Sequence, residues 1–138
     1  MARRDKIHDA VKNALIKDGW TITADPYEIK YKRVKLQADL AADRPIAADR
    51  GEEKIVVEIK SFLSLSPIHE LQAALGQYQM YLAFLESTAP ERRLFLAVSQ
   101  QIWEELFLLE AIQDLIARWE LRLFVVDLKA EEILLWKK

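Results

Sequence analysis

Lys54-Ile55-Val56-Val57-Glu58-Ile59-Lys60 is the stretch of this sequence that decides its fold. Its side chains alternate as they do in a β-strand, where neighbours point to opposite faces. One face takes Ile55, Val57 and Ile59, and the other takes Lys54, Val56, Glu58 and Lys60. We therefore predict a strand that ends with an acid and a lysine side by side.

A second predicted strand precedes it and carries another acid. Residues 34–40 alternate, with Val34, Leu36, Ala38 and Leu40 on one face and Lys35, Gln37 and Asp39 on the other. The acid-x-lysine pattern occurs four times in the chain, so it is weak alone. Only Glu58-Ile59-Lys60 follows an acid-bearing strand and precedes a long helix, and this context selects it.

Asp39, Glu58 and Lys60 suit the hydrolysis of a phosphodiester. Magnesium is usually held by one or two carboxylates plus waters. Asp39 and Glu58 on adjacent strands can supply the carboxylates, with the carbonyl of Ile59 as a further oxygen. Lys60 can orient the attacking water or stabilise the developing charge. The alternative is a set of solvated charges with an ion pair of little consequence.

A long helix is predicted from Ser66-Pro67 through residue 86, because proline is favoured in a first helical turn. Its apolar stripe contains Leu71, Leu75, Tyr78, Leu82 and Leu85. Gln77 and Tyr81 are four residues apart and share a face offset from that stripe. They can close over the acidic site, or Tyr81 can be a core or rim aromatic with Gln77 as its neighbour.

The rest of the chain predicts an α/β fold with a mixed sheet flanked by helices, formed by residues 1–138 as a single domain. Helices are predicted at 5–17 and 101–118. Strands are predicted at 20–24, 94–98, 122–127 and 132–136, and 27–32 can extend or pair with the strand at 20–24. Residues 41–53 contain Pro45, Gly51 and many charges, which predicts mostly loop.

Composition narrows the class of protein. The chain has 138 residues, no cysteine and a formal net charge of −2. Cysteine-based zinc sites and disulfides are therefore excluded. No apolar run approaches the roughly 20 residues needed to span a bilayer. We expect a cytoplasmic protein without a membrane association. A protein that grips long DNA alone is usually strongly basic, and this one is not.

Two surfaces are candidates for partners. The best phosphate-contacting group comprises Arg3, Arg4, Lys30, Lys32, Arg33 and Lys35, with a solvated strand edge as the equal alternative. The predicted helix at 101–118 carries Trp103, Phe107 and Leu108 outside its main stripe. One amphipathic face cannot bury all of them, so we expect self-association or a protein partner there.

The order of these motifs resembles a known superfamily. Asp39, then Glu58-Ile59-Lys60, then the Gln77 and Tyr81 pair resembles the PD-(D/E)xK nucleases, especially members with a Q-x-x-x-Y helix motif. Residues 3–20, 57–63 and 74–78 more specifically resemble the XisH family. Proteins of that family are described as controlling factors for excision of a DNA element from cyanobacterial chromosomes.

The resemblance implies a restriction-endonuclease-like fold and a set of roles. Asp39 and Glu58 would bind Mg²⁺ or Mn²⁺, Lys60 would be the catalytic lysine, and Gln77 and Tyr81 would support them. DNA and a protein of the XisI type would be partners. Many superfamily members place a glutamate on the first helix near the metal. Here the matching position is His8, which is otherwise expected at the surface or rim of a helix.

Two functions follow from different features. The complete set of Asp39, Glu58 and Lys60 with Gln77 and Tyr81 favours a metal-dependent deoxyribonuclease acting in, or controlling, site-specific DNA excision. The slightly acidic balance favours a non-catalytic regulator that binds DNA or a partner and directs a separate recombinase. A third option is a structural interaction subunit whose site has no present use.

Overall fold

The structure, a computed structural model, describes residues 6–46 and 51–138. The helices are α1 (His8–Lys17), α2 (Pro67–Thr88), α3 (Gln100–Ile102) and α4 (Glu110–Trp119), with a π-helical turn, η1 (Trp103–Phe107), after α3. The strands are β1 (Thr21–Ala24), β2 (Tyr27–Tyr31), β3 (Val34–Ala38), β4 (Leu40–Pro45), β5 (Glu52–Ile59), β6 (Arg92–Ser99), β7 (Leu123–Asp127) and β8 (Glu132–Lys137).

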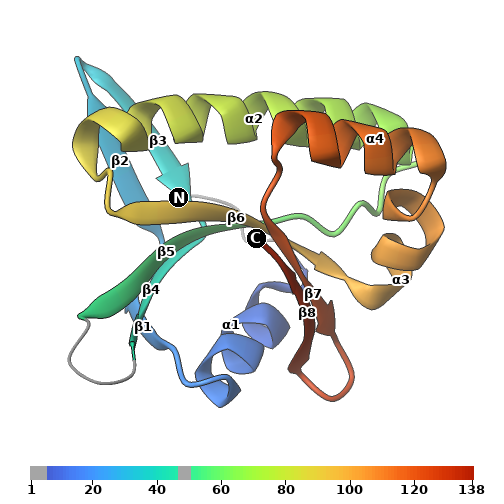
Figure 1. The fold of residues 1–138 in the computed structure, drawn as a ribbon, viewed down its shortest axis with the longest axis horizontal. Coiled ribbons are helices and arrows are strands. Elements are labelled where there is room, and N and C mark those ends of the chain that lie inside the picture. Colours follow the sequence, from blue (N-terminus) through green and yellow to red (C-terminus); the bar gives the residue numbers. More distant parts are fainter. Residues whose placement is uncertain (1–5, 47–50) are drawn as a thin grey trace.

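Six strands form one mixed sheet in the order β1-β4-β5-β6-β7-β8. The central strands β5, β6 and β7 are parallel, and β1, β4 and β8 pair antiparallel with their neighbours. Helices α2 and α4 cover one face of this sheet and α1 covers the other (Figure 1). The prediction of an α/β fold with a mixed sheet flanked by helices is therefore confirmed.

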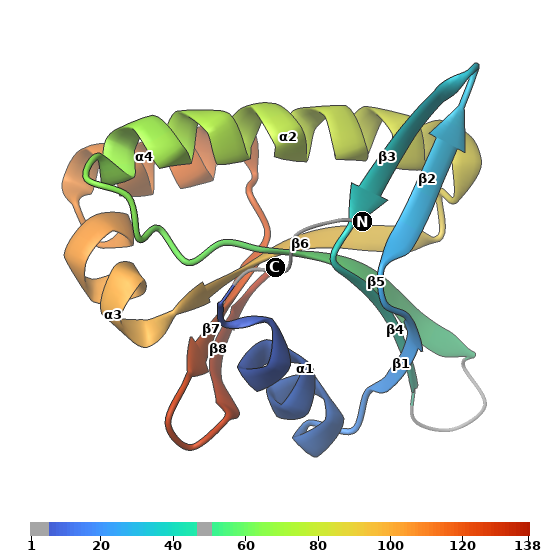
Figure 2. The same ribbon diagram turned by 180° about the vertical axis from the view of Figure 1, so that it is seen from behind.

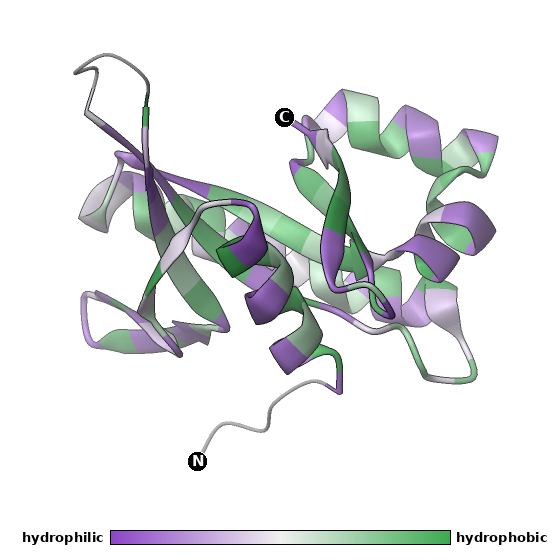
Figure 3. Ribbon diagram, turned by 90° about the horizontal axis from the view of Figure 1, so that it is seen from below, coloured by the Kyte–Doolittle hydropathy of each residue, from purple (hydrophilic) through white to green (hydrophobic). Residues whose placement is uncertain are grey.

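The alternation in β5 places its side chains in two separate cores. Ile55, Val57 and Ile59 join the core beneath α1, whereas Val56 joins the core beneath α2. The central strands are mainly hydrophobic, and the helices are banded with polar and apolar residues (Figure 3). Residues 55–59 of β5 are buried, with side chains in both cores, so apolar residues are favoured there. Glu58, only 6% exposed, is the exception that calls for a reason.

Strands β2 and β3 depart from the prediction. They pair with each other in a separate two-stranded sheet, and β2 does not pair with β1. The predicted continuous strand at 34–40 is also wrong, because it breaks at Asp39. Ala38 then packs in the α2 core and Leu40 in the α1 core, so they do not share a face. The break gives Asp39 a position between two sheets.

The prediction of a loop at residues 41–53 is wrong for its outer parts. Strand β4 runs to Pro45 and β5 begins at Glu52. Charged side chains are tolerated in these strands because they are paired: Arg44 lies 3.2 Å from Glu53, and Arg92 lies 3.0 Å from Asp43. Residues 47–50 lie outside the described part of the chain.

The predicted helix at 101–118 is broken into α3, η1 and α4. The backbone of Leu109 is extended, which ends one helix and begins the next. This rearrangement buries Phe107 completely, with its ring edge-on to Phe62 at 5.7 Å. The expectation that Phe107 lies outside the core is therefore wrong. Leu108 and Leu109 remain exposed, each at 51%.

Within the described ranges, no helix is long and apolar enough to cross a membrane.

Candidate active site

Asp39 is fixed at the point where the chain passes from one sheet to the other. Its Oδ2 accepts a hydrogen bond of 2.7 Å from the backbone N–H of Ile59, near the end of β5. This bond ties the start of β4 to the end of β5. A short contact to an ionised carboxylate is among the stronger hydrogen bonds in proteins. The break in the strand therefore delivers a carboxylate beside Glu58.

Glu58 and Lys60 meet at the same end of β5. The Nζ of Lys60 lies 3.5 Å from Oε2 of Glu58. The other oxygen of Glu58, Oε1, is buried with no hydrogen-bond partner in the described part of the protein. The backbone N–H of Lys60 donates to the carbonyl of Ala97, which extends the β5–β6 ladder by one residue. The structure thus brings Asp39, Glu58 and Lys60 together.

The two carboxyl groups are electrostatically unfavourable in this position. Burial raises the pKa of Glu58 to about 8, the charge of Asp39 adds to the increase, and Lys60 opposes it. Burial also raises the pKa of Asp39, although the N–H of Ile59 and the charge of Lys60 counteract it. Perturbed carboxyl pKa values of this kind concentrate at functional sites. The cluster is therefore held at a cost that a bound cation would relieve.

His8 stands on α1 beside the carboxyl pair. It is 3% exposed, so the expectation of a surface or rim position is wrong. Its Nε2–H donates to Oδ1 of Asp25 at 2.9 Å, and Lys12 Nζ donates to Oδ2 of the same carboxylate at 2.8 Å. This leaves Nδ1, which has no hydrogen-bond partner, 4.0 Å from Oδ1 of Asp39.

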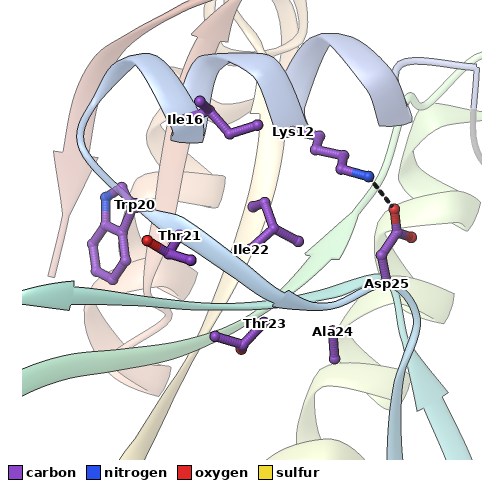
Figure 4. A pocket seen from close by; sticks show the side chains of 8 residues that line it. All are labelled: Lys12, Ile16, Trp20, Thr21, Ile22, Thr23, Ala24 and Asp25. Carbon is purple, nitrogen blue, oxygen red and sulfur yellow. Dashed lines mark hydrogen bonds and ion pairs between the residues drawn. The ribbon is translucent and has the colours of Figure 1, made fainter.

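Asp25 was missed by reasoning from sequence. The available signal was His8 and Lys12, four residues apart on one helix face, followed by an acid at the end of the next strand. Asp25 also lines a cleft of about 550 Å³ between α1 and β1 (Figure 4). The Lys12–Asp25 ion pair lies at one end of this cleft, and His8 links Asp25 to the neighbourhood of Asp39 through its two ring nitrogens.

The two residues of the Q-x-x-x-Y motif have different surroundings. The hydroxyl of Tyr81 donates to the carbonyl of Gln37 at 2.9 Å, two residues before Asp39. Burial raises the pKa of Tyr81, and the charges of Glu58 and Asp39 raise it further. Gln77 is exposed on α2, and its side chain makes no hydrogen bond to another described residue. The supporting role of Gln77 stays a prediction.

Replacing Tyr81 with phenylalanine is expected to destabilise the protein by about 1 kcal/mol, because it removes a hydrogen bond to a partly buried carbonyl. The loss should also loosen β3 just before Asp39. Gln77→Ala is the matched control on the same helix, and it should leave stability within about 0.5 kcal/mol of wild type. Urea unfolding measures both, and equal effects of the two variants would contradict the assigned contact.

The donor set fits a hard divalent cation that keeps part of its water shell. Asp39 and Glu58 supply carboxylate oxygens, and Glu58 Oε1 is a buried acceptor without a partner. Across the residues that the structure describes, no group of three or more His, Cys, Asp and Glu side chains could hold a metal ion. Such a two-carboxylate set, completed by water and a carbonyl, is typical of Mg²⁺ rather than Zn²⁺.

The fold and the site together define an α/β protein with a buried glutamate, a half-buried aspartate and a lysine at the end of a central strand. The particular family follows from comparison with known proteins. The family model described as XisH protein matches residues 1–134, and the chain belongs to this family.

Two solved structures are similar over nearly the whole chain. One is an XisH family protein from Nostoc punctiforme PCC 73102, with 40% sequence identity and a TM-score of 0.88; the match covers 97% of this chain and 100% of that one. The other is an fdxN element excision controlling factor protein from Anabaena variabilis, with 39% identity and a TM-score of 0.88, covering 98% and 100%. No curated protein matches the chain.

Proposed function

We propose that this protein is a divalent-metal-dependent deoxyribonuclease that acts in the excision of a DNA element. The observation that carries the proposal is Glu58, a buried acid with one unpartnered oxygen, held between Asp39 and Lys60. A purely structural sheet position would be filled by an apolar residue, as its neighbours Val57 and Ile59 are. The similarity to an excision controlling factor supports the biological context.

Each residue has a defined task in this proposal. Asp39 and Glu58 would bind Mg²⁺ or Mn²⁺, with the carbonyl of Ile59 as a further oxygen. When bound, the ion would lower the pKa of water and polarise the phosphoryl oxygen. Lys60 would orient the attacking water or stabilise charge on the phosphate. His8 would support Asp39 from α1, because a nitrogen ligand suits magnesium poorly.

The second candidate is a non-catalytic regulator of a separate recombinase. The formal net charge of −2 favours it, since a nuclease that grips long DNA alone is usually basic. A protein partner of the XisI type, or a second copy of the chain, would then supply further contacts. The exposed Leu108 and Leu109, next to the half-buried Trp103, are the proposed surface for it.

Cleavage of DNA by the purified protein tests the proposal directly. We expect wild type to cut duplex, nicked, branched or single-stranded DNA with Mg²⁺ or Mn²⁺, and EDTA to abolish the activity. The assay is run with and without a candidate partner of the XisI type. If no substrate is cut under any of these conditions, although the protein binds the metal, the regulator is the correct function.

A further inference from the structure

The β2–β3 hairpin stands apart from the main sheet and projects past α2 (Figures 1 and 2). One face is anchored: Ile29 is 1% exposed, and the ring of Tyr31 lies 5.5 Å from that of Phe84 on α2. The hydrogen bond from Tyr81 to Gln37 adds a second attachment. The hairpin is therefore a supported arm rather than a loose loop.

The outer face of the arm carries an unfavourable charge pair. Lys30 and Lys35 are directly opposite each other in the two strands, and like charges in that position destabilise a sheet. A single carboxylate, Glu28, lies 3.1 Å from Lys35 and 4.0 Å from Lys30. Both lysines are more than half exposed. One acid between two lysines leaves this face positive.

The tip of the arm also carries positive charges at positions where they lower stability. Lys32 and Arg33 form the two-residue loop between the paired residues Tyr31 and Val34. Both have positive φ, 44° and 72°, which favours glycine or asparagine in such a loop. A left-handed backbone costs other residues about 1 kcal/mol each. Two cations thus occupy the positions where stability would select Asn-Gly.

The arm leads directly to the candidate active site. Strand β2 begins two residues after Asp25, and β3 ends next to Asp39. At about 3.3 Å per residue, Lys35 lies roughly 13 Å along the strand from Asp39. Roughly four nucleotides of a DNA strand span the same length, at 3.4 Å each. A DNA backbone held at Lys35 is therefore within reach of the carboxylate pair.

We propose that the β2–β3 hairpin is a DNA-binding arm that holds the phosphate backbone of duplex DNA. Lys30, Lys32, Arg33 and Lys35 contact the phosphates, and a two-stranded ribbon fits the major groove. The arm concentrates positive charge on a protein whose net charge is −2, so DNA binding does not need a basic chain. The inference rests on the proposed function, in which this DNA is the substrate.

The test compares two triple variants with the same change in charge. K30Q/R33Q/K35Q neutralises the arm, and R118Q/K129Q/K137Q neutralises exposed cations on α4, the β7–β8 turn and β8, away from the arm (Figure 1). Binding of a labelled duplex is followed by fluorescence anisotropy in EDTA. We expect the arm variant to bind at least about tenfold more weakly. The slope of log K against log salt concentration should also become less steep, by roughly 0.9 for each lost phosphate contact. The control variant should bind within about twofold of wild type.

A tip variant separates binding from folding. K32N/R33G removes both tip cations and introduces the residues that the backbone favours, so we expect it to be more stable and to bind duplex DNA more weakly. Three results would contradict the proposed DNA-binding arm. K32N/R33G could bind DNA as tightly as wild type, the two triple variants could lose affinity equally, or wild type could bind no tighter than K30Q/R33Q/K35Q.

The outcome is distinguishable from that of the nuclease proposal. If wild type binds DNA through the arm but never cuts it, the DNA-binding arm is supported and the nuclease proposal is contradicted. Cutting that continues at the wild-type rate in K30Q/R33Q/K35Q would do the reverse. Unfolding curves of all variants, recorded in the same buffer, exclude loss of fold as the cause of weaker binding.

Discussion

Glu58→Gln is expected to reduce metal-dependent DNA cleavage by about a thousandfold or more, the largest effect of any single change in the site. A glutamine is nearly the same size, so the β5 strand keeps its packing. It lacks the negative charge that holds the ion, and stabilisation of a phosphoryl transition state by a metal is worth several kcal/mol. Single-turnover cleavage with saturating DNA measures the loss.

Lys60→Gln separates the lysine's role from metal binding. It should lower cleavage by about a hundredfold or more, because it removes a charged group that stabilises the transition state. The ion should still bind, since Asp39 and Glu58 remain and a repulsive neighbour is gone. Mg²⁺ or Mn²⁺ should therefore still stabilise Lys60→Gln by about 2.7 kcal/mol at one hundred times its dissociation constant.

The metal response of the carboxylate variants provides the control. Asp39→Asn and Glu58→Gln should lose the metal-induced rise in melting temperature, whereas Glu86→Gln, an exposed carboxylate on α2, should keep it. Thermal unfolding with Mg²⁺, with Mn²⁺ and with EDTA covers all four variants and wild type. If the ion stabilises every protein equally, it binds elsewhere and the assigned metal ligands are wrong.

The central strand could be predicted because its alternating, mainly apolar sequence fits a strand that is covered on both faces. Period-two alternation from Ile55 to Ile59 filled both cores, and both faces of the strand are covered. Glu58 and Lys60 at the end of this run were selected because a strand carrying Asp39 precedes them and a long helix follows, and the structure shows that Glu58 is buried. Local pattern was sufficient here because burial on two sides leaves little freedom.

The surroundings of Asp39 could not be predicted in the same way. The alternation of residues 34–40 continues through the break, so pattern alone cannot reveal that Ala38 and Leu40 enter different cores. Strand pairing decides which core each residue enters, because β3 pairs with β2 whereas β4 pairs with β5. Tertiary context overrides local preference in such strands. The same holds for His8, which is buried and hydrogen-bonded to Asp25, 17 residues away in the chain.

The pH dependence of stability should report directly on Glu58. Its pKa is raised from 4.5 to about 8 in the folded protein. Between these values the native state keeps a proton that the unfolded chain has lost, so stability falls as pH rises. The contribution of protonated Glu58 to the free energy of unfolding is fully present below about pH 4.5 and is lost as the pH rises through about 8. One proton gives a slope of at most about 1.4 kcal/mol per pH unit.

Glu58→Gln should remove this slope, because glutamine cannot ionise. The variant should therefore exceed wild type in stability at pH 9 by roughly 2 kcal/mol or more, and match it more closely near pH 5. Asp39→Asn removes the charge that helps to raise the pKa of Glu58, so the part of its stability curve due to Glu58 should stop falling at a lower pH than in wild type, with a smaller total loss. Urea unfolding in EDTA from pH 5 to 9 gives the three curves. The difference between wild type and Glu58→Gln reports on Glu58 and its coupling to Asp39, since all other side chains are common to both. Parallel curves would mean that Glu58 ionises in the folded protein as easily as in the unfolded chain, and the strained carboxylate pair would no longer explain why the site attracts a cation.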